Sequence, residues 1–217
     1  MTVSEFSRGE IAELLGVGDG RVSVVPGGVG EAFRPDADAA AARAALRLDR
    51  PYVLCVASAT ARKNLGALVP AARALAAEGV ELAVAGGHRP QFAAEQGLDA
   101  LRLLGHVDDA LLPGLYAGAE AFALPSLYEG FGLPVLEAMA AGTPVLTTTA
   151  GALPETCGGA ARLVEDPAAF ATELPALLVD SAGRERLRAA GLARAAGFSW
   201  ERTAREVDAL LVAEAGS

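Results

Sequence analysis

The residues best suited to chemistry lie in one segment, residues 125–140, where two glutamates flank a pair of glycines. Glu129 and Glu137 are separated by seven residues, and Gly130 and Gly132 follow the first glutamate. One continuous helix would hold the two carboxylates about 12 Å apart along its axis, so they cannot share one bond as an acid–base pair. With Glu129 in a loop and Glu137 in the second turn of a helix, they could bind two parts of one elongated ligand through hydroxyl groups. The alternative is that Glu129 is a charge at a helix start and Glu137 a solvated surface acid.

The glycines of this segment favour an anionic ligand. The segment follows a strand-like run and opens a helix-like one, and Gly130 and Gly132 permit close approach of the backbone. Free N–H groups at a helix start attract anions. In an open parallel sheet, ligands bind outside the carboxyl ends of the strands, where this loop would lie. A diphosphate or a sugar hydroxyl is therefore the expected ligand.

A basic pair, Arg62 and Lys63, forms the second candidate. The pair follows a strand-like run and a short loop, and it stands where a helix is expected to start at Asn64. Cations at a helix N-terminus oppose the helix dipole, so they are badly placed unless an anion joins them. This position favours phosphate binding, and the alternative is two solvated surface charges.

The elements that must position these residues follow an alternating pattern. From Pro51 onward, short apolar runs alternate with amphipathic stretches of helical length, which is typical of βαβ units. Strands are expected at residues 52–57, 81–85, 101–104, 121–124 and 143–147. Helices are expected at residues 64–78, 90–97, 109–117 and 133–141. The predicted fold class is α/β, a Rossmann-like doubly wound parallel sheet flanked by helices.

The ends of the chain are predicted to differ from this sheet domain. Upstream we expect a helix at 7–15, a strand at 21–25, a turn at 26–28 and a surface helix at 39–46; downstream, helices at 167–179, 182–196 and 199–211. The last helix carries one apolar stripe, which could pack on the chain's own sheet or face another domain. The stripe consists of Trp200, Ala204, Val207 and Leu211.

Composition narrows the class of protein. The 217 residues suit one sizeable α/β domain, and 18 basic against 27 acidic residues, with no basic cluster, argue against a nucleic-acid partner. Cys55 and Cys157 lie far apart without metal-ligand spacing and are expected to be reduced thiols. The sequence shows no signal-peptide pattern and no apolar run of roughly 18 residues, so a cytoplasmic protein is expected.

Three motifs together resemble the group 1 (family four) retaining glycosyltransferases, whose GT-B fold pairs two Rossmann-like domains. They are Arg-Lys-Asn-Leu at 62–65, Pro-Ser-Leu-Tyr-Glu-Gly-Phe-Gly at 125–132, and Glu-Ala-Met-Ala-Ala-Gly-Thr-Pro-Val at 137–145. Shorter segments at 3–8, 24–29 and 198–201 extend the resemblance over essentially the whole chain. The chain is similar to the C-terminal, donor-binding half. The expected division is a linker with a residual N-terminal-domain segment at 1–30, the Rossmann-like domain at 31–198 and a crossover helix at 199–217.

The resemblance implies a role for each candidate residue in binding a GDP- or UDP-linked hexose. Glu137 would hold the ribose, Glu129 the donor sugar and Lys63 the diphosphate. Backbone N–H groups for sugar and phosphate would come from Gly130, Phe131, Gly132 and Leu133. Lys63 and Glu129 are the expected catalytic residues, with Lys63 and the helix start stabilising the charge that builds on the leaving diphosphate.

One position departs from the family pattern. Family members commonly have an arginine where this sequence has Ser58. Either Arg62 substitutes for that arginine, or Lys63 binds the diphosphate with fewer partners.

The resemblance implies neither a metal nor another cofactor. The sequence lacks an Asp-x-Asp cluster, and His88 and His106 have no partner at metal-ligand spacing.

An N-terminal Rossmann-like domain with the acceptor site is expected outside this chain, and the chain alone should transfer no sugar. The full-length protein could also lie peripherally on a membrane. The alternatives are a non-catalytic nucleotide-sugar sensor and half of a sugar-nucleotide epimerase, which is disfavoured because its chemistry needs further acid/base groups.

Overall fold

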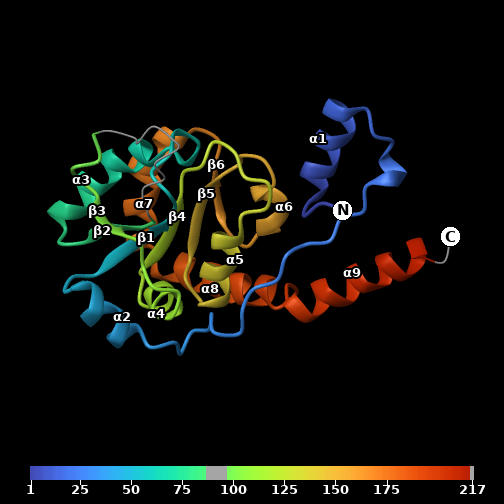
Figure 1. The fold of residues 1–217 in the computed structure, drawn as a ribbon. Coiled ribbons are helices and arrows are strands. Elements are labelled where there is room, and N and C mark those ends of the chain that lie inside the picture. Colours follow the sequence, from blue (N-terminus) through green and yellow to red (C-terminus); the bar gives the residue numbers. More distant parts are fainter. Residues whose placement is uncertain (87–96, 216–217) are drawn as a thin grey trace.

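A computed structural model describes residues 1–86 and 97–215 of the chain. In this part of the chain, six parallel strands form one sheet in the order β3-β2-β1-β4-β5-β6 (Figure 1). The strands are β1 (Tyr52–Val56), β2 (Glu81–Ala85), β3 (Arg102–Gly105), β4 (Ala121–Leu124), β5 (Val145–Thr148) and β6 (Arg162–Val164). The predicted fold class is confirmed.

Helices cover both faces of the sheet (Figure 1). The helices of the described residues are α1 (Glu5–Leu15), α2 (Ala39–Leu46), α3 (Val69–Ala77), α4 (Leu112–Ala117), α5 (Leu133–Ala140), α6 (Leu153–Cys157), α7 (Phe170–Val179), α8 (Ser181–Ala195) and α9 (Trp200–Ala215). Helix α3 packs on α7, α5 on α8, and α2 on α4. Since helices lie on both sides, every residue of β4 and β5 is buried, as is typical of short apolar strands in a parallel sheet.

Some predicted elements are wrong or shifted. Residues 21–25 form no strand: Asp19–Arg21 is a 3₁₀ turn, and only Val24 pairs, in an isolated bridge to Thr2. The helix expected from Asn64 starts as a 3₁₀ turn at Leu65–Leu68, because Asn64 itself takes a left-handed φ of 51°. The helix expected at 109–117 begins at Leu112. The helix expected at 90–97 falls on residues outside the described ones, apart from Gly97.

Two elements have no counterpart in the prediction. Strand β6 has three residues and α6 has five, so neither is long enough to show a periodic pattern. The remaining strands and helices agree with the predicted ranges to within a few residues.

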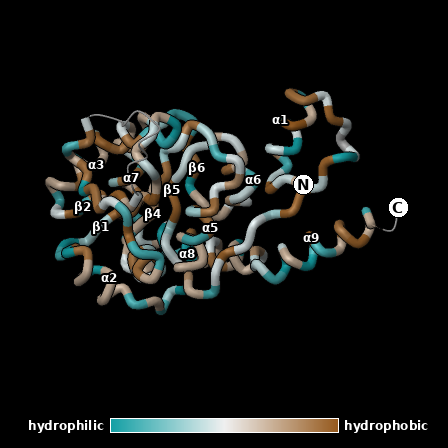
Figure 2. Tube along the Cα trace, in the orientation of Figure 1, coloured by the Kyte–Doolittle hydropathy of each residue, from teal (hydrophilic) through white to brown (hydrophobic). Residues whose placement is uncertain are grey.

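Helices α1 and α9 project away from the sheet and contain no buried residue (Figure 1). Apolar residues occur on both of them as well as along the central strands (Figure 2). The alternative that α9 packs on this chain's own sheet is therefore wrong: Trp200 and Leu211 are more than half exposed, at 51% and 56%. No helix in the described residues combines the length and hydropathy of a membrane span.

Candidate functional site

The reversal in strand order puts the candidate motifs together. Strands β1 and β4 are neighbours, and the sheet grows outward from them in opposite directions. In such a sheet the crevice for ligands opens beyond the carboxyl ends of these two strands. The loop after β1 carries Arg62 and Lys63, and the loop after β4 carries Glu129 and Gly130. Both predicted segments therefore lie at the edge of the sheet where such a crevice is expected.

Hydrogen bonds tie these two loops to each other. The Leu127 N–H donates to the Arg62 carbonyl at 2.9 Å, and the Arg62 guanidinium donates to the Tyr128 carbonyl at 2.7 Å. The Asn64 amide donates to the Pro125 carbonyl at 3.2 Å. The two motifs thus form one connected unit although more than 60 residues separate them along the chain.

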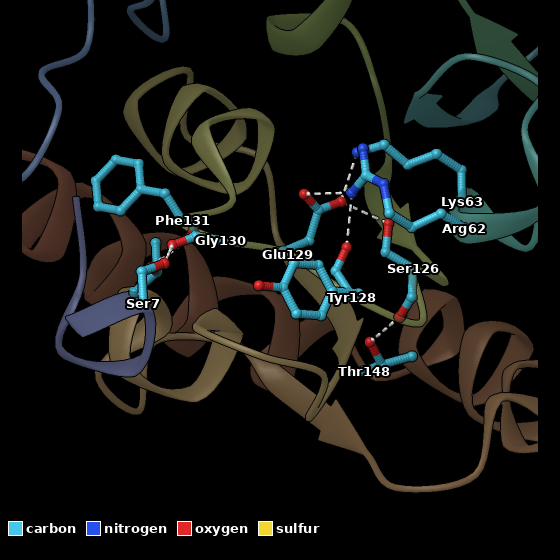
Figure 3. A network of polar contacts seen from close by, with 10 residues as sticks. Ser7, Arg62, Lys63, Ser126, Tyr128, Glu129, Gly130, Phe131 and Thr148 are labelled. Atoms are coloured by element: carbon cyan, nitrogen blue, oxygen red, sulfur yellow. Dashed lines mark hydrogen bonds and ion pairs between the residues drawn. The ribbon is translucent and has the colours of Figure 1, made fainter. Parts of the chain in front are cut away.

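Lys63 and Glu129 form an ion pair at the centre of this unit (Figure 3). Lys63 Nζ lies 2.5 Å from Glu129 Oε1, and the Ser126 hydroxyl donates to the same oxygen at 2.6 Å. The Lys63 and Glu129 side chains are only 11% and 9% exposed, while the Arg62 side chain, 3.4 Å from Glu129 Oε2, is 49% exposed. Burying each charge costs several kcal/mol, and removing one partner of such a pair typically costs about 3–5 kcal/mol.

The ion pair corrects the argument from the helix dipole. Arg62 and Lys63 lie in a three-residue 3₁₀ turn, Ala61–Lys63, and not in the first turn of α3. The charge that neutralises Lys63 in this chain is the Glu129 carboxylate. The alternative of two solvated cations is wrong for Lys63, and that of a helix-start charge is wrong for Glu129, which lies buried in the loop before α5.

Ser126 and Thr148 belong to this unit although they are not among the predicted site residues. Thr148, at the carboxyl end of β5, donates its hydroxyl to the Ser126 carbonyl at 2.7 Å. Ser126 is fully buried, and its hydroxyl donates a hydrogen bond to Glu129 Oε1. Ser126 stands inside the recognised motif, but Thr148 carries no sequence signal beyond its position at a strand end.

The loop from Gly130 to Leu133 leads into α5. Gly132 precedes the helix with φ 92°, and a Cβ there would come 2.7 Å from Leu153 Cδ2, so an added side chain would be strained and would displace the Leu153 side chain. Within the described ranges, the N–H groups of Gly130, Phe131 and Gly132 have no acceptor. The Phe131 ring packs edge-on against Phe198 at 6.0 Å. Phe131 can therefore offer a ligand its backbone, while its ring holds the loop.

Glu137 lies in the second turn of α5, as predicted, and is partly buried. Its Oε2 accepts a hydrogen bond from the Tyr116 hydroxyl of α4 at 2.8 Å. Burial raises the pKa of Glu137 above its usual value, the Tyr116 hydrogen bond lowers it, and the Asp109 charge raises it further. The alternative of a solvated surface acid is therefore wrong. The Glu137 carboxylate already accepts one hydrogen bond, from Tyr116, and can accept others from the hydroxyls of a ligand.

Ser58 lies just beyond β1 and is partly buried. Its neighbours Ala57 and Ala59 line an open, mostly apolar cavity of ≈ 600 Å³. The other lining residues are Leu65, Val84, Gly86, Gly97, Leu98, Asp99, Leu101, Leu103 and Gly105. This cavity adjoins the turn that carries Lys63.

Two further observations on the described residues concern metal-ligand groups and the cysteines. They hold no group of three or more His, Cys, Asp and Glu side chains that could bind a metal ion. Cys55 and Cys157 are free and buried, and burial raises the pKa of each thiol to about 12. Both therefore stay protonated and act as core side chains.

Known proteins with the same sequence pattern are glycosyltransferases. The family model described as glycosyl transferases group 1 matches residues 50–180. O-antigen chain mannosyltransferase B of Escherichia coli is 36% identical over 93% of this chain and 57% of its own length. A D-inositol 3-phosphate glycosyltransferase of Frankia alni is 36% identical over 92% of this chain and 55% of its own length. The chain thus spans little more than half of these relatives.

Two solved structures share the fold of this chain. Sucrose-phosphate synthase from Thermosynechococcus elongatus superimposes with a TM-score of 0.82 at 30% identity, covering all of this chain and 58% of that one. HepE of Anabaena, solved with UDP and glucose, has a TM-score of 0.82 at 18% identity, covering 97% of this chain and 62% of that one, and shows the shared fold. With a family model matching more than half of it, this chain belongs to the group 1 glycosyltransferases.

Proposed function

We propose that this chain binds a nucleotide sugar through its diphosphate and that the protein containing it transfers the hexose with retained configuration. The observation that carries the proposal is the Lys63–Glu129 pair, which joins the loops after the neighbouring strands β1 and β4. It puts a buried cation and a buried carboxylate where an open parallel sheet binds its ligand. Family membership supports transfer over the epimerase alternative.

The diphosphate would replace Glu129 as the counter-charge of Lys63. In the free chain, Glu129 neutralises the ammonium group and so keeps the site closed to weak anions. A diphosphate carries more charge and would attract both Lys63 and the half-exposed Arg62, which takes the place of the family arginine missing at Ser58. Glu129 would then be free to accept hydrogen bonds from hydroxyls of the donor sugar.

The remaining candidates fit the other parts of a nucleotide sugar. The unpaired N–H groups of the 130–133 loop suit phosphate and sugar oxygens. Glu137, with one face on Tyr116, suits the ribose hydroxyls, and the apolar cavity beside Ser58 suits a flat base. The relatives named as mannosyltransferases and a structure solved with UDP-glucose favour a GDP- or UDP-linked mannose or glucose.

Catalysis would rest on electrostatics. As the bond to the diphosphate breaks, negative charge builds on the leaving group, and Lys63 with the loop N–H groups is already aimed at that position. We propose that Glu129 is a catalytic residue, because its carboxylate would leave Lys63 and bind hydroxyls of the donor sugar. No described residue stands out as an acceptor site, which we place in a further Rossmann-like domain.

The test is binding of UDP, GDP, UDP-glucose and GDP-mannose, measured by calorimetry. Lys63→Met alone would leave Glu129 buried without a counter-charge and could unfold the chain. The double variant Lys63→Met/Glu129→Gln removes both charges and keeps the volume. We expect it to melt like the wild type but to lose on the order of 1.5–3 kcal/mol of nucleotide binding. Equal binding by a folded double variant would remove Lys63 from the site.

A further inference from the structure

One carbonyl of the donor loop is bonded by two hydroxyls from the other end of the chain. Ser4 Oγ lies 2.7 Å from the Gly130 carbonyl oxygen, and Ser7 Oγ lies 3.1 Å from the same oxygen. Both serines stand more than 120 residues before Gly130 in the sequence. Ser4 is 1% exposed, so water does not compete for its hydroxyl, which lies closer to the Gly130 oxygen than to Ser7 Oγ at 3.0 Å.

The two serines are themselves held in place. Ser4 caps α1, since its Oγ accepts the Ser7 N–H at 3.0 Å. The Glu155 carboxylate of α6 accepts the N–H groups of Glu5 at 2.9 Å and Phe6 at 3.1 Å. The start of α1 is therefore fixed against α6, and its hydroxyls meet Gly130 from a defined direction.

The hydrogen bonds to the Gly130 carbonyl set the direction of the Phe131 N–H. The peptide between Gly130 and Phe131 is trans, so its C=O and N–H groups point in opposite directions. With the Gly130 carbonyl turned toward Ser4 and Ser7, the Phe131 N–H must point away from α1. Figure 3 shows Ser7 on one side of Gly130, with Glu129 and Lys63 on the other. No acceptor in residues 1–86 or 97–215 binds that N–H.

We propose that Ser4 and Ser7 are positioning residues that aim the Phe131 N–H into the donor site. The inference rests on the proposed function, because it assigns that N–H to the sugar or phosphate of the donor. Glycine has no Cβ, so a peptide next to Gly130 can rotate at little steric cost unless something holds it. The two hydroxyls hold it before the ligand arrives, so binding need not order this peptide.

The experiment compares hydroxyl variants of the 217-residue chain by calorimetry and amide NMR. Ser7→Ala is the primary variant, because alanine is a good helix former and leaves α1 intact. Ser7→Thr keeps the hydroxyl, and Arg8→Ala changes the next residue of α1, whose partner is the exposed Glu5. Ser4→Ala/Ser7→Ala removes both donors to Gly130. The probes are UDP-glucose and GDP-mannose.

For whichever probe the wild type binds, we expect Ser7→Ala to raise the Kd about 3-fold and the double variant about 10-fold. The shift of the Phe131 amide resonance on binding should shrink in the same order. Ser7→Thr and Arg8→Ala should match the wild type in both measurements. Unchanged affinity and an unchanged Phe131 shift in the double variant would overturn the inference, as would a Ser7→Thr as weak as Ser7→Ala. A wild type that binds neither probe would instead contradict the proposed function, before any variant is compared.

Discussion

Glu137 connects the titration of one carboxyl group to ligand binding. Burial raises its pKa in the free chain, whereas ribose hydroxyls that donate to it would favour the ionised form. Binding should therefore lower its pKa and release a proton, and affinity should increase as pH rises through the titration of Glu137. We expect calorimetry at pH 5, in buffers of different ionisation enthalpy, to detect that proton. In Glu137→Gln the release should vanish; its persistence would assign the proton to another group.

The same raised pKa predicts how stability depends on pH. A carboxyl whose pKa is higher in the folded chain stabilises it below the pKa of the unfolded chain, and that contribution is lost as pH rises through the folded value. The melting temperature of Glu137→Gln relative to the wild type should thus be higher at pH 7 than at pH 4. An equal difference at both pH values would mean that burial of Glu137 has no energetic consequence.

Glu129→Gln should lower the stability of the free chain without weakening its affinity for a nucleoside diphosphate. The variant leaves Lys63 without its counter-charge, so the free chain should lose about 3–5 kcal/mol of stability. A nucleoside diphosphate no longer competes with a carboxylate for Lys63, so UDP or GDP should bind at least as tightly as to the wild type, while UDP-glucose or GDP-mannose should lose its advantage over them. Calorimetry checks both; weaker binding of the free diphosphate would contradict the exchange of counter-charges.

At the scale of elements, the start of α5 depends on Gly132. In Gly132→Ala the new Cβ would meet Leu153 Cδ2 at 2.7 Å in a left-handed conformation. We expect a loss of roughly 1–3 kcal/mol in the free energy of unfolding, together with weaker donor binding. Gly159→Ala is the matched control, because Gly159 has a φ of 83° but open space around it. Gly159→Ala should lose stability only, by denaturant unfolding, and keep donor binding.

Helix α9 adds little to the stability of this chain by itself. Leu211 and Val212 are 56% and 66% exposed, so Leu211→Ser/Val212→Ser should change the free energy of unfolding by less than about 0.5 kcal/mol. Leu124→Ala, in the fully buried β4, should cost about 2–5 kcal/mol. A large loss in the α9 variant would show that the helix packs on the chain in solution.

At the scale of the whole molecule, we expect the chain to bind a donor without transferring its sugar. The chain spans 57% and 55% of two curated relatives, and α1 and α9 expose apolar residues on the same side of the sheet domain (Figure 1). A second domain over the crevice would position the acceptor, and proximity of that kind supplies about 7–11 kcal/mol of a barrier. Radiolabelled nucleotide sugars with saccharide and lipid acceptors test this; efficient transfer by residues 1–217 alone would contradict it.

The sequence predicts those parts of the molecule that depend on local pattern. Apolar runs and turn residues locate β1, β2 and β4, and the motif around Glu129 indicates the candidate site, because both are encoded by neighbours along the chain. The Lys63–Glu129 pair and the Ser4–Gly130 contact are not encoded locally, since 66 and 126 residues separate the partners. The strand order brings the first pair together, and the contact between α1 and α6 brings the second pair together. The helix-dipole argument for Lys63 failed for the same reason, because its partner Glu129 comes from the loop after β4.

Lys63 and Glu129 are 66 positions apart in the sequence, so they leave the ribosome at different times. During synthesis at about 5–20 residues per second, Lys63 emerges about 3–13 s before Glu129 does. In that interval the lysine has no carboxylate, and β1 is an open edge whose neighbour β4 has not been made. The nascent sheet should therefore remain incomplete at its centre, where the crevice will form, until its second half arrives. A ribosome stalled near residue 115 would hold the chain in the state most exposed to aggregation and to chaperones.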